Sequence, residues 1–493
     1  MRILLIHPPD SAVSISPGRM EPLSLEILAA TVPQHEVWIL DLRIDPFRKL
    51  KDELHTFKPS LIGITSNNTI HVNQALRTIS QIRMYDRDAK VIVGGFHPTL
   101  MPGDFHVPGV DAIFLGWADK SFPAFVDELE RGNHFEKIPG IEILENGKAV
   151  LRNEIIWNLK ATDIPHPRRD LAERYLSHYR SDLGFKTALV NTARGCPSRC
   201  AFCGVWQVAQ GHFLLRDPND VYREITSLPS NVHRVFFADD NTFIHPGNAG
   251  KLCEMLLESG VRMKYSGYCR SDTILKYPDL FRQWKKAGLD NLCVGFEGVD
   301  NQLLGQMNKQ NSSENNAGAA QILNETGIPF RPHFLIDPGF DKSDFQNILQ
   351  YVRANRLRSP IFPILTPIPG TQLHTELKDK IILDYDYFDF AHATIATHLP
   401  VGDFYSSWMD LYFKSYPILK NLKSAFMQFI GRVLKNKEIV FNYAHLSLTK
   451  LFLLRFFGFF LQRKIMRHFS EFEKEIIKNH TSTGIGNLKH SYM

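Results

Sequence analysis

Cysteine is absent from the first 195 residues, and the whole chain of 493 residues contains six. A disulfide framework, which is typical of small secreted proteins, is therefore not expected. No signal peptide is recognisable either, because the apolar start Met1–Ile6 is interrupted at once by His7-Pro8-Pro9-Asp10. Both absences favour a reducing compartment, so we expect a cytoplasmic protein.

Long hydrophobic runs are also lacking. The most apolar stretch, residues 451–461, is too short for a membrane-spanning helix, which needs roughly 20 residues. From Lys420 onward, thirteen lysines and arginines stand against four glutamates, although the whole chain carries a net charge of +5. Residues 404–478 have a helical pattern, which favours either a helix lying in the membrane interface or a helical cap packed over the rest. Nucleic acid is not expected as a partner.

Three of the six cysteines lie within eight residues, as Cys196-x3-Cys200-x2-Cys203. A [4Fe–4S] cluster normally takes four thiolates, so three in one short loop leave one iron open to a substrate or cofactor. A structural zinc site is the alternative, but it needs four ligands, and no second C-x2-C or H-x3-H pair follows. The other cysteines fall in apolar patterns and are expected in the core: Cys253, Cys269 and Cys293.

Short apolar runs alternate with helical patterns over residues 1–130, which predicts a parallel, doubly wound α/β sheet. The predicted strands are 2–6, 36–40, 61–65, 91–93 and 112–115, and the predicted helices are 22–31, 46–57, 75–84 and 122–130. Ligands of such sheets bind beyond the carboxyl ends of the strands. The pair Gly94-Gly95 at one such end lets a bulky ligand approach the backbone. A dinucleotide is not expected, because no G-x-G-x-x-G follows the first strand.

Asn146-Gly147 between two β-rich runs predicts a hairpin, and the proline-rich stretch 164–170 predicts a linker. Strands and helices then alternate again, with strands at 187–191, 234–238, 263–268, 291–294, 332–336 and 361–365. Six such units form a partial barrel, whose active site is built at the carboxyl ends of the strands. The expected domains are residues 1–130, a connector over 131–186, the barrel over 187–395 and a helical C-terminal region over 396–493.

The cysteine octet resembles the signature of radical S-adenosylmethionine (SAM) enzymes, in which the open iron of the cluster chelates the amino and carboxylate groups of SAM. The resemblance implies that Cys196, Cys200 and Cys203 bind the cluster. It also implies SAM contacts from seven residues: Phe202, Asp239, Asp240, Asn241, Arg270, Gly295 and Glu297. Phe202 would lie against the adenine, and Asp239 and Asp240 would accept hydrogen bonds from the SAM amino group. Arg270 would bind the carboxylate, and Glu297 the ribose.

The elements upstream of the octet resemble the cobalamin-binding domain of one large radical SAM subgroup. The resemblance implies ten cobalamin-binding positions: His7, Ser66, Asn67, Asn68, Gly94, Gly95, Phe96, His97, Gly116 and Trp117. Many relatives carry Gly-Glu-Gly-Glu where this chain has Gly116-Trp117-Ala118-Asp119. Asp104-x-His106-x-x-Gly109 fits a D-x-H-x-x-G pattern that supplies a cobalt ligand in other cobalamin proteins, but it follows Gly94-Gly95 instead of the first strand. We therefore expect cobalamin without a histidine ligand from that motif.

The implied architecture is α/β throughout the first two domains: a Rossmann-like, doubly wound cobalamin-binding domain, then a partial (β/α)6 TIM-barrel radical SAM domain, then a helical C-terminal domain. The region of residues 388–392, 397–400 and 404–405, together with Asp337-Pro338 and residues 366–371, resembles the hopanoid C-3 methylase-like branch in particular. His392 and His398 follow, and either could reach the mouth of the active site or pack in the core.

The resemblance implies a methyltransferase that acts on an unactivated carbon through a 5′-deoxyadenosyl radical and methylcobalamin. The basic, apolar tail favours a hydrophobic small-molecule substrate, such as a lipid, an isoprenoid or a tetrapyrrole, and peripheral association with the inner face of the membrane. A flavodoxin- or ferredoxin-type protein would supply the electron. The alternatives are a ring-forming cyclase of the anaerobic magnesium-protoporphyrin ester type and, from another class, a non-catalytic cobalamin and cluster sensor.

Overall fold

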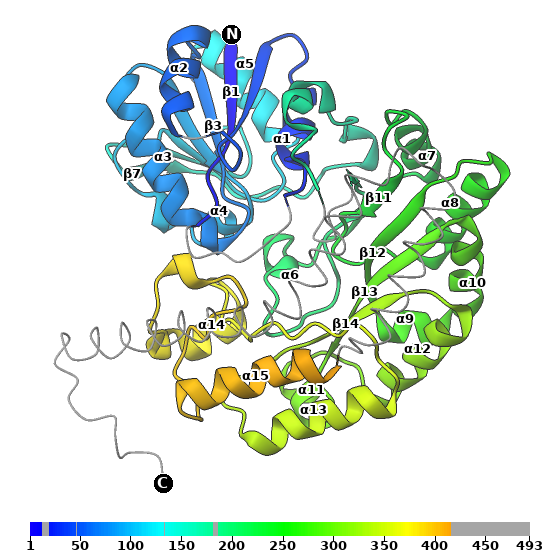
Figure 1. The fold of residues 1–493 in the computed structure, drawn as a ribbon. Helices are drawn as coiled ribbons and strands as arrows, with labels where there is room; N and C mark the ends of the chain where they lie inside the picture. The colour runs from blue at the N-terminus through cyan, green and yellow to red at the C-terminus, as the bar shows by residue number, and fades with distance from the viewer. Residues whose placement is uncertain (12–18, 46, 133, 181–185, 416–493) are drawn as a thin grey trace, which may run out of the picture. The chain divides into compact units, whose positions relative to one another are not determined.

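The computed structural model describes residues 1–11, 19–45, 47–132, 134–180 and 186–415 (Figure 1). The chain divides into two compact units. The first contains residues 1–296, 300–330 and 366–394, and the second contains residues 297–299, 331–365 and the described chain from 395 onward. The expected C-terminal helical pattern beyond residue 415, with its apolar and basic stretch, lies outside the described residues.

The N-terminal part of the first unit is built on a seven-stranded sheet with the order β2-β1-β3-β4-β5-β6-β7. Five strands are parallel: β1 (Arg2–His7), β2 (Glu36–Asp41), β3 (Leu61–Thr65), β4 (Lys90–Gly94) and β5 (Ala112–Phe114). The helices between them are α1 (Leu23–Ala30), α2 (Phe47–Phe57), α3 (Val72–Tyr85), α4 (Phe96–Leu100) and α5 (Ser121–Arg131). Short 3-10 turns occur at Thr69–His71 (η1) and Pro102–Phe105 (η2).

Alternating side chains of the central strands explain why helices cover both faces of this sheet. Leu4 belongs to one buried cluster, with Leu50 of α2 and Ile79 of α3. The next residue, Leu5, belongs to a second cluster on the opposite face, with residues of α1 and α5 such as Phe122. The predicted doubly wound α/β fold is therefore confirmed (Figure 1).

The predicted hairpin continues the same sheet. Strands β6 (Ile141–Glu145) and β7 (Lys148–Arg152) are antiparallel, and β6 pairs with β5. Asn146 and Gly147 form the turn with φ angles of 51° and 78°, the left-handed values that a tight hairpin requires. Further 3-10 turns follow at Ala161–Asp163 (η3) and Arg169–Tyr175 (η4).

A second parallel sheet carries the cysteine loop. Within the first unit its strands run in the order β13-β12-β11-β8, namely β13 (Leu289–Glu297), β12 (Lys264–Arg270), β11 (Arg234–Phe237) and β8 (Ala188–Val190). A small antiparallel pair, β9 (Ala193–Arg194) and β10 (Leu214–Leu215), brackets the loop, which is followed by α6 (Val205–Val208). The other helices of the first unit are α7 (Pro218–Thr226), α8 (Pro246–Glu258), α9 (Ser271–Lys276), α10 (Pro278–Ala287), α11 (Asn301–Gln306), α12 (Ser313–Thr326) and α14 (Gln372–Leu377). Its last 3-10 turns are η5 (Lys378–Lys380) and η6 (Tyr385–Tyr387).

Local chemistry sets the limits of these helices. Asp217 caps α7 by accepting a hydrogen bond from the Asn219 amide, and a proline occupies the first helical position. Helix α10 buries one stripe through Phe281 and Trp284 and ends at Gly288, which has a left-handed φ of 118°.

The second unit contains β14 (Phe330–Phe334), α13 (Lys342–Ala354) and α15 (Val401–Ser415). The predicted sixth strand appears as two isolated parallel bridges, His333 to Ile361 and Ile336 to Ile364. Helix α15 covers the start of the predicted C-terminal helical region, and the Trp408 indole donates a 2.7 Å hydrogen bond to the Phe362 carbonyl. Among the residues that the structure describes, no helix has the length and apolar character to cross a membrane.

Candidate active site

A cavity of about 590 Å³ lies at the carboxyl ends of β1, β3, β4 and β5. Eight of the ten predicted cobalamin positions line it: His7, Asn67, Asn68, Gly94, Gly95, Phe96, Gly116 and Trp117. The opposite part of its wall comes from the sheet that carries the cysteine loop: Leu189, Asn191, Arg194, Gly195, Val205, Val208, Ala209, Ala238 and Asp240. One cavity thus joins the strand ends of the two sheets.

Ser66 and His97, the two remaining predicted positions, stand behind the wall. Both are buried, and the Ser66 carbonyl accepts a 3.1 Å hydrogen bond from the His97 amide. Between them, Gly95 has a φ of 123°, and a Cβ there would lie 2.8 Å from the Asn67 side-chain oxygen. A glycine is therefore required at this position, and Ser66 and His97 shape the β4 end instead of facing the cavity.

The Asp and His side chains of the D-x-H-x-x-G pattern contact other side chains of the protein. Asp104 Oδ2 is 2.9 Å from His97 Nε2 and accepts a 2.9 Å hydrogen bond from the Tyr385 hydroxyl. His106 Nε2 lies 2.7 Å from Glu142 Oε2. Neither Asp104 nor His106 is among the residues that line the described cavity.

Two neutral imidazoles stand at the β1 and β3 side of the cavity. His7 and His71 both line it, and their rings meet edge to face with centroids 5.1 Å apart. Burial lowers the pKa of His71 to about 4 and also lowers the pKa of His7, so neither carries a proton on both nitrogens at neutral pH. The sequence analysis missed His71, although its place just after the Ser66–Asn68 strand end could have indicated it.

The cysteine loop is fixed by segments that are distant in sequence. Ala201 donates its amide to the Met307 carbonyl and accepts from the Leu373 amide, both at 3.0 Å. The Trp206 indole donates to the Cys200 carbonyl at 3.0 Å, and the Asn308 amide donates to the Arg199 carbonyl at 2.8 Å. These bonds hold the loop backbone in one conformation, so its three thiols are presented from a rigid support.

None of the six cysteines, all of which are described, forms a disulfide. Burial raises the pKa of the Cys203 thiol to about 12, so it stays protonated until a metal displaces the proton. No three His, Cys, Asp or Glu side chains of the described chain are arranged around a single metal ion. The three thiolates of an iron–sulfur cube bind different irons and need not converge on one point. Cys253, Cys269 and Cys293 are buried in the core, as predicted.

Gly195 makes the turn into this loop. Its φ is 78°, and a Cβ would lie 2.3 Å from the His212 carbonyl oxygen. The Gly195 amide donates a 3.1 Å hydrogen bond to Asp240 Oδ2. A glycine at position 195 is therefore required for the close approach of this turn to the segment that follows α6.

Asp239 and Asp240, which the sequence assigned the same role, differ in the structure. Asp239 is buried, and its oxygens accept hydrogen bonds from the amides of Thr192 and Ala193 and from the Thr192 hydroxyl, at 2.6 to 2.9 Å. Burial raises its pKa to about 6. Asp240 is accessible from the cavity. Asp239 thus braces the entry to the cysteine loop, and Asp240 is the carboxylate that can reach a ligand.

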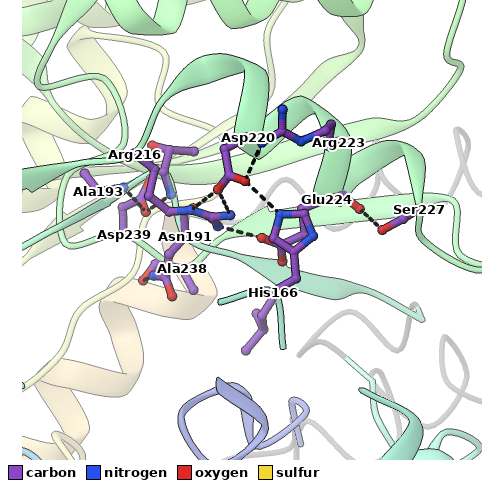
Figure 2. A network of polar contacts seen from close by, with 12 residues as sticks. His166, Asn191, Ala193, Arg216, Asp220, Arg223, Glu224, Ser227, Ala238 and Asp239 are labelled. Carbon is purple, nitrogen blue, oxygen red and sulfur yellow. Dashed lines mark hydrogen bonds and ion pairs between the residues drawn. The ribbon is translucent and has the colours of Figure 1, made fainter. Parts of the chain in front are cut away.

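A network of buried charges supports the same strand ends (Figure 2). Arg216 donates to the Asn191 carbonyl at 2.9 Å and forms ion pairs with Asp220 and Glu224, whose nearest oxygens are 2.5 and 2.6 Å away. The Asn191 side chain in turn donates to the Ala238 carbonyl at 2.8 Å. The network ties the end of β8 to the end of β11, where Asp239 and Asp240 begin.

The other predicted SAM positions are scattered. Arg270 pairs with Asp272 at 2.9 Å and donates to the Ser198 hydroxyl of the cysteine loop at 3.4 Å. Asn241 is buried, and its side-chain oxygen has no hydrogen-bond partner within the described chain. Phe202 is partly buried in the loop, and Gly295 lies within β13. Glu297 belongs to the second unit, is buried and has an unusual φ of 63°.

The two histidines of the following segment have structural partners. His392 is buried, and its Nδ1 lies 3.0 Å from both oxygens of Asp389. His398 donates its amide to the Pro338 carbonyl at 2.8 Å. Of the two alternatives for His392, the structure supports a histidine that is packed in the core.

The buried Asp239 carboxyl should make the stability of the protein depend on pH. Its folded pKa of about 6 exceeds the ordinary value, so its contribution to stability is present at low pH and is lost as the pH rises through 6. Asp239→Asn keeps the shape and does not ionise. When the pH is raised from 5 to 7.5, the free energy of unfolding, measured with denaturant, should decrease by about 1 kcal/mol more for the wild type than for the variant. An equal loss in the two proteins would contradict the assignment.

Two family models match this chain, the B12 binding domain over residues 12–126 and the radical SAM superfamily over residues 190–352. This chain belongs to the cobalamin-binding radical SAM superfamily. The two family descriptions name B12 (cobalamin) and SAM, and one related solved structure, that of TsrM, contains cobalamin and a [4Fe–4S] cluster. The hopanoid C-3 methylase of Methylococcus capsulatus is 25% identical over 413 residues, which are 82% of this chain and 78% of that protein. The anaerobic magnesium-protoporphyrin IX monomethyl ester cyclase of Rubrivivax gelatinosus is 25% identical over 79% of this chain and 72% of its own length.

Solved structures of the superfamily share the fold. The radical SAM methyltransferase TsrM of Kitasatospora setae, with tryptophan and a SAM analogue bound, has a TM-score of 0.63 and 19% identity, and the match covers 77% of this chain and 76% of that one. The cobalamin-dependent enzyme OxsB, with aqua-cobalamin and SAM bound, has a TM-score of 0.68 and 15% identity over 99% of this chain and 81% of that one.

The residues present fit these cofactors. On the cobalamin side, Gly63, Gly94, Gly95 and Gly116 line the cavity without side chains, which leaves room for a broad, flat macrocycle. On the other side, the loop with three thiols stands beside Gly195 and Asp240 of the same wall. Sequence analysis missed Arg43, Asp119, Arg194 and the α6 residues of the wall, because nothing in a single sequence tells such side chains from ordinary loop residues.

Proposed function

We propose that this protein is a cobalamin-dependent radical SAM methyltransferase that methylates an unactivated carbon of a hydrophobic substrate. The observation that carries the proposal is the single cavity whose wall combines the glycine-rich strand ends of the first sheet with the flank of the cysteine loop. Methyl transfer requires both cofactors to face one substrate carbon, and a shared cavity meets this need. The similarity to the hopanoid C-3 methylase supports the same reading.

When bound, the cluster and SAM supply a carbon-centred radical, and cobalamin supplies the methyl group. In the proposal, Cys196, Cys200 and Cys203 hold the cluster, and the Asp240 carboxylate accepts hydrogen bonds from the SAM ammonium group. The buried Asn241 amide, whose oxygen lacks a partner within the described chain, is a second acceptor for the same ligand. Arg270, already paired with Asp272, acts on the loop through Ser198. The eight cavity-lining cobalamin positions form the opposite wall.

A hydrophobic substrate is favoured by the apolar part of the cavity. The wall includes Leu23, Ile27, Leu28, Phe114, Phe122, Val205, Val208 and Ala209. Such a surface excludes water from a radical and gains free energy from apolar contact with the substrate. A lipid, an isoprenoid or a tetrapyrrole fits this requirement. The proposal further includes a flavodoxin- or ferredoxin-type electron donor and a cytoplasmic location, with contact to the inner face of the membrane.

Anaerobic reconstitution tests the reaction. Protein loaded with the cluster and cobalamin, given SAM and a low-potential reductant, should form both 5′-deoxyadenosine and S-adenosylhomocysteine. Absence of 5′-deoxyadenosine from a protein with full iron and cobalamin would favour a non-catalytic sensor. Lipid and pigment profiles of a deletion strain and its parent would then identify the substrate by the loss of one methylated compound.

A ring-forming cyclase is the second candidate, and the similarity to the anaerobic magnesium-protoporphyrin ester cyclase supports it. The two candidates differ in the fate of the SAM methyl group. With methyl-deuterated SAM, a methyltransferase labels its product and releases S-adenosylhomocysteine, whereas a cyclase gives an unlabelled product. The deletion strain should correspondingly accumulate either an unmethylated lipid or an open-ring pigment precursor.

A further inference from the structure

A buried ion pair crosses the cavity between the two sheets. Asp119, in the loop after β5, accepts a 2.6 Å hydrogen bond at Oδ2 from the Arg194 guanidinium of β9. Asp119 is 6% exposed and Arg194 is 16% exposed at the side chain, and both residues line the cavity. Arg194 lies two residues before Cys196, and Asp119 lies three residues after Gly116. The pair therefore joins the cobalamin side of the wall directly to the entry of the cysteine loop.

The environment makes this pair costly to break. The second oxygen of Asp119 is buried and has no hydrogen-bond partner within the described chain, so Arg194 is the cation that compensates the carboxylate. Removal of one member of a buried pair leaves an uncompensated buried charge and is strongly destabilising. An exposed pair, such as Arg168 with Asp170, contributes much less.

Aromatic contacts run alongside the pair. Trp117 meets Trp157 edge to face with centroids 5.0 Å apart, and Trp157 stacks on His212 at 5.0 Å. The Trp157 indole donates a 2.8 Å hydrogen bond to the Gln210 side chain. His212 is the residue whose carbonyl lies against Gly195. The loop after β5 thus contacts the segment before the cysteine loop directly, through Arg194, and the segment after it indirectly, through Trp157.

We propose that Asp119 and Arg194 are a positioning pair that sets the distance between cobalamin and the iron–sulfur cluster. The pair touches neither reacting atom; it acts through the Gly116–Asp119 loop on one side and through the Arg194–Cys196 turn on the other. The inference rests on the proposed function for the placement of the two cofactors. A displacement of about 1 Å can slow an oriented reaction about 100-fold. Without the ion pair, methyl donation by SAM would therefore be slowed relative to its reductive cleavage.

The test compares holoproteins carrying Asp119→Asn, Arg194→Gln and both changes. The matched control carries Arg168→Gln and Asp170→Asn, which removes an exposed pair. After iron, cobalamin and thermal stability are measured, pulsed EPR records the dipolar coupling between cob(II)alamin and the one-electron-reduced cluster. The ratio of S-adenosylhomocysteine to 5′-deoxyadenosine is measured on the same samples and needs no knowledge of the substrate.

The wild type and the control should give one narrow distance distribution. Each single variant should give a broadened distribution and a ratio at least about tenfold lower, and the double variant should be no worse than either single variant, because both changes break one interaction. Single variants with full cofactor loading and an unchanged distribution would overturn the inference, and so would additive effects in the double variant. A wild type that retains neither cofactor would instead contradict the proposed function.

Discussion

Cys200→Ala should abolish reductive SAM cleavage, with 5′-deoxyadenosine falling at least about a thousandfold while bound cobalamin is retained. The expected loss is large because a cluster that lacks one of three protein ligands is not held, and SAM then has no iron to bind. Cys200 is buried in a loop that is anchored from Met307, Leu373 and Trp206, so no other thiol can move into its place without breaking that support.

Iron content, the cluster absorbance and product analysis are the measurements. Cys253→Ala is the matched control, since Cys253 is fully buried in α8 and outside the loop. The control should bind a full cluster and lose only a modest amount of stability, of about 1 kcal/mol. A normal cluster content in the Cys200 variant would refute the assignment of this cysteine as a ligand, and loss of the cluster in the Cys253 variant would point to a different ligand set.

Gly195→Ala should prevent the cysteine loop from closing, and we expect less than about a tenth of the wild-type iron after reconstitution. Two effects combine at this position. The left-handed φ of 78° costs about 1–2 kcal/mol for alanine, and the new Cβ would be 2.3 Å from a backbone oxygen that cannot move aside cheaply. The resulting backbone shift would displace Cys196, the next residue. It would also disturb Asp240, which accepts a hydrogen bond from the Gly195 amide.

The chain offers a control that separates the two effects. Gly260 has a similar φ of 70°, but a Cβ there would meet no atom within 4 Å. Gly260→Ala should therefore show only the conformational cost, seen as a small decrease in the free energy of unfolding, with normal iron content. Equal behaviour of the two variants would mean that the close contact with His212 is unimportant.

Most of the fold could be predicted from periodic patterns. The apolar runs of the first 115 residues predicted β1 to β5 within one or two residues, because parallel strands that are buried on both faces are almost continuously hydrophobic. The hairpin was also predicted from Asn146-Gly147, but its place beside β5 was not, since strand pairing depends on contacts that a local pattern does not encode. The sixth predicted strand was reduced to two bridges for the same reason.

The candidate site could be predicted at its glycines and cysteines and less well at its charges. Gly94, Gly95 and the cysteine triplet are recognisable because backbone geometry or metal chemistry restricts each to one residue type. Asp239 and Asp240 are adjacent and identical, so the sequence could not reveal that one is saturated by the Thr192–Ala193 turn while the other faces the cavity. The partnership of Asp119 with Arg194 spans 75 residues and could not be inferred from either residue alone.

The anchoring of the cysteine loop also bears on how the protein is made. The loop emerges from the ribosome well before Met307 and Leu373, whose backbone groups hold Ala201 in place. During that interval the three thiols lack their final support, and an oxidant or a stray metal ion could reach them. Cluster insertion is therefore expected to follow synthesis of the segment around Leu373, and cellular assembly of the active protein depends on keeping the nascent loop reduced until then.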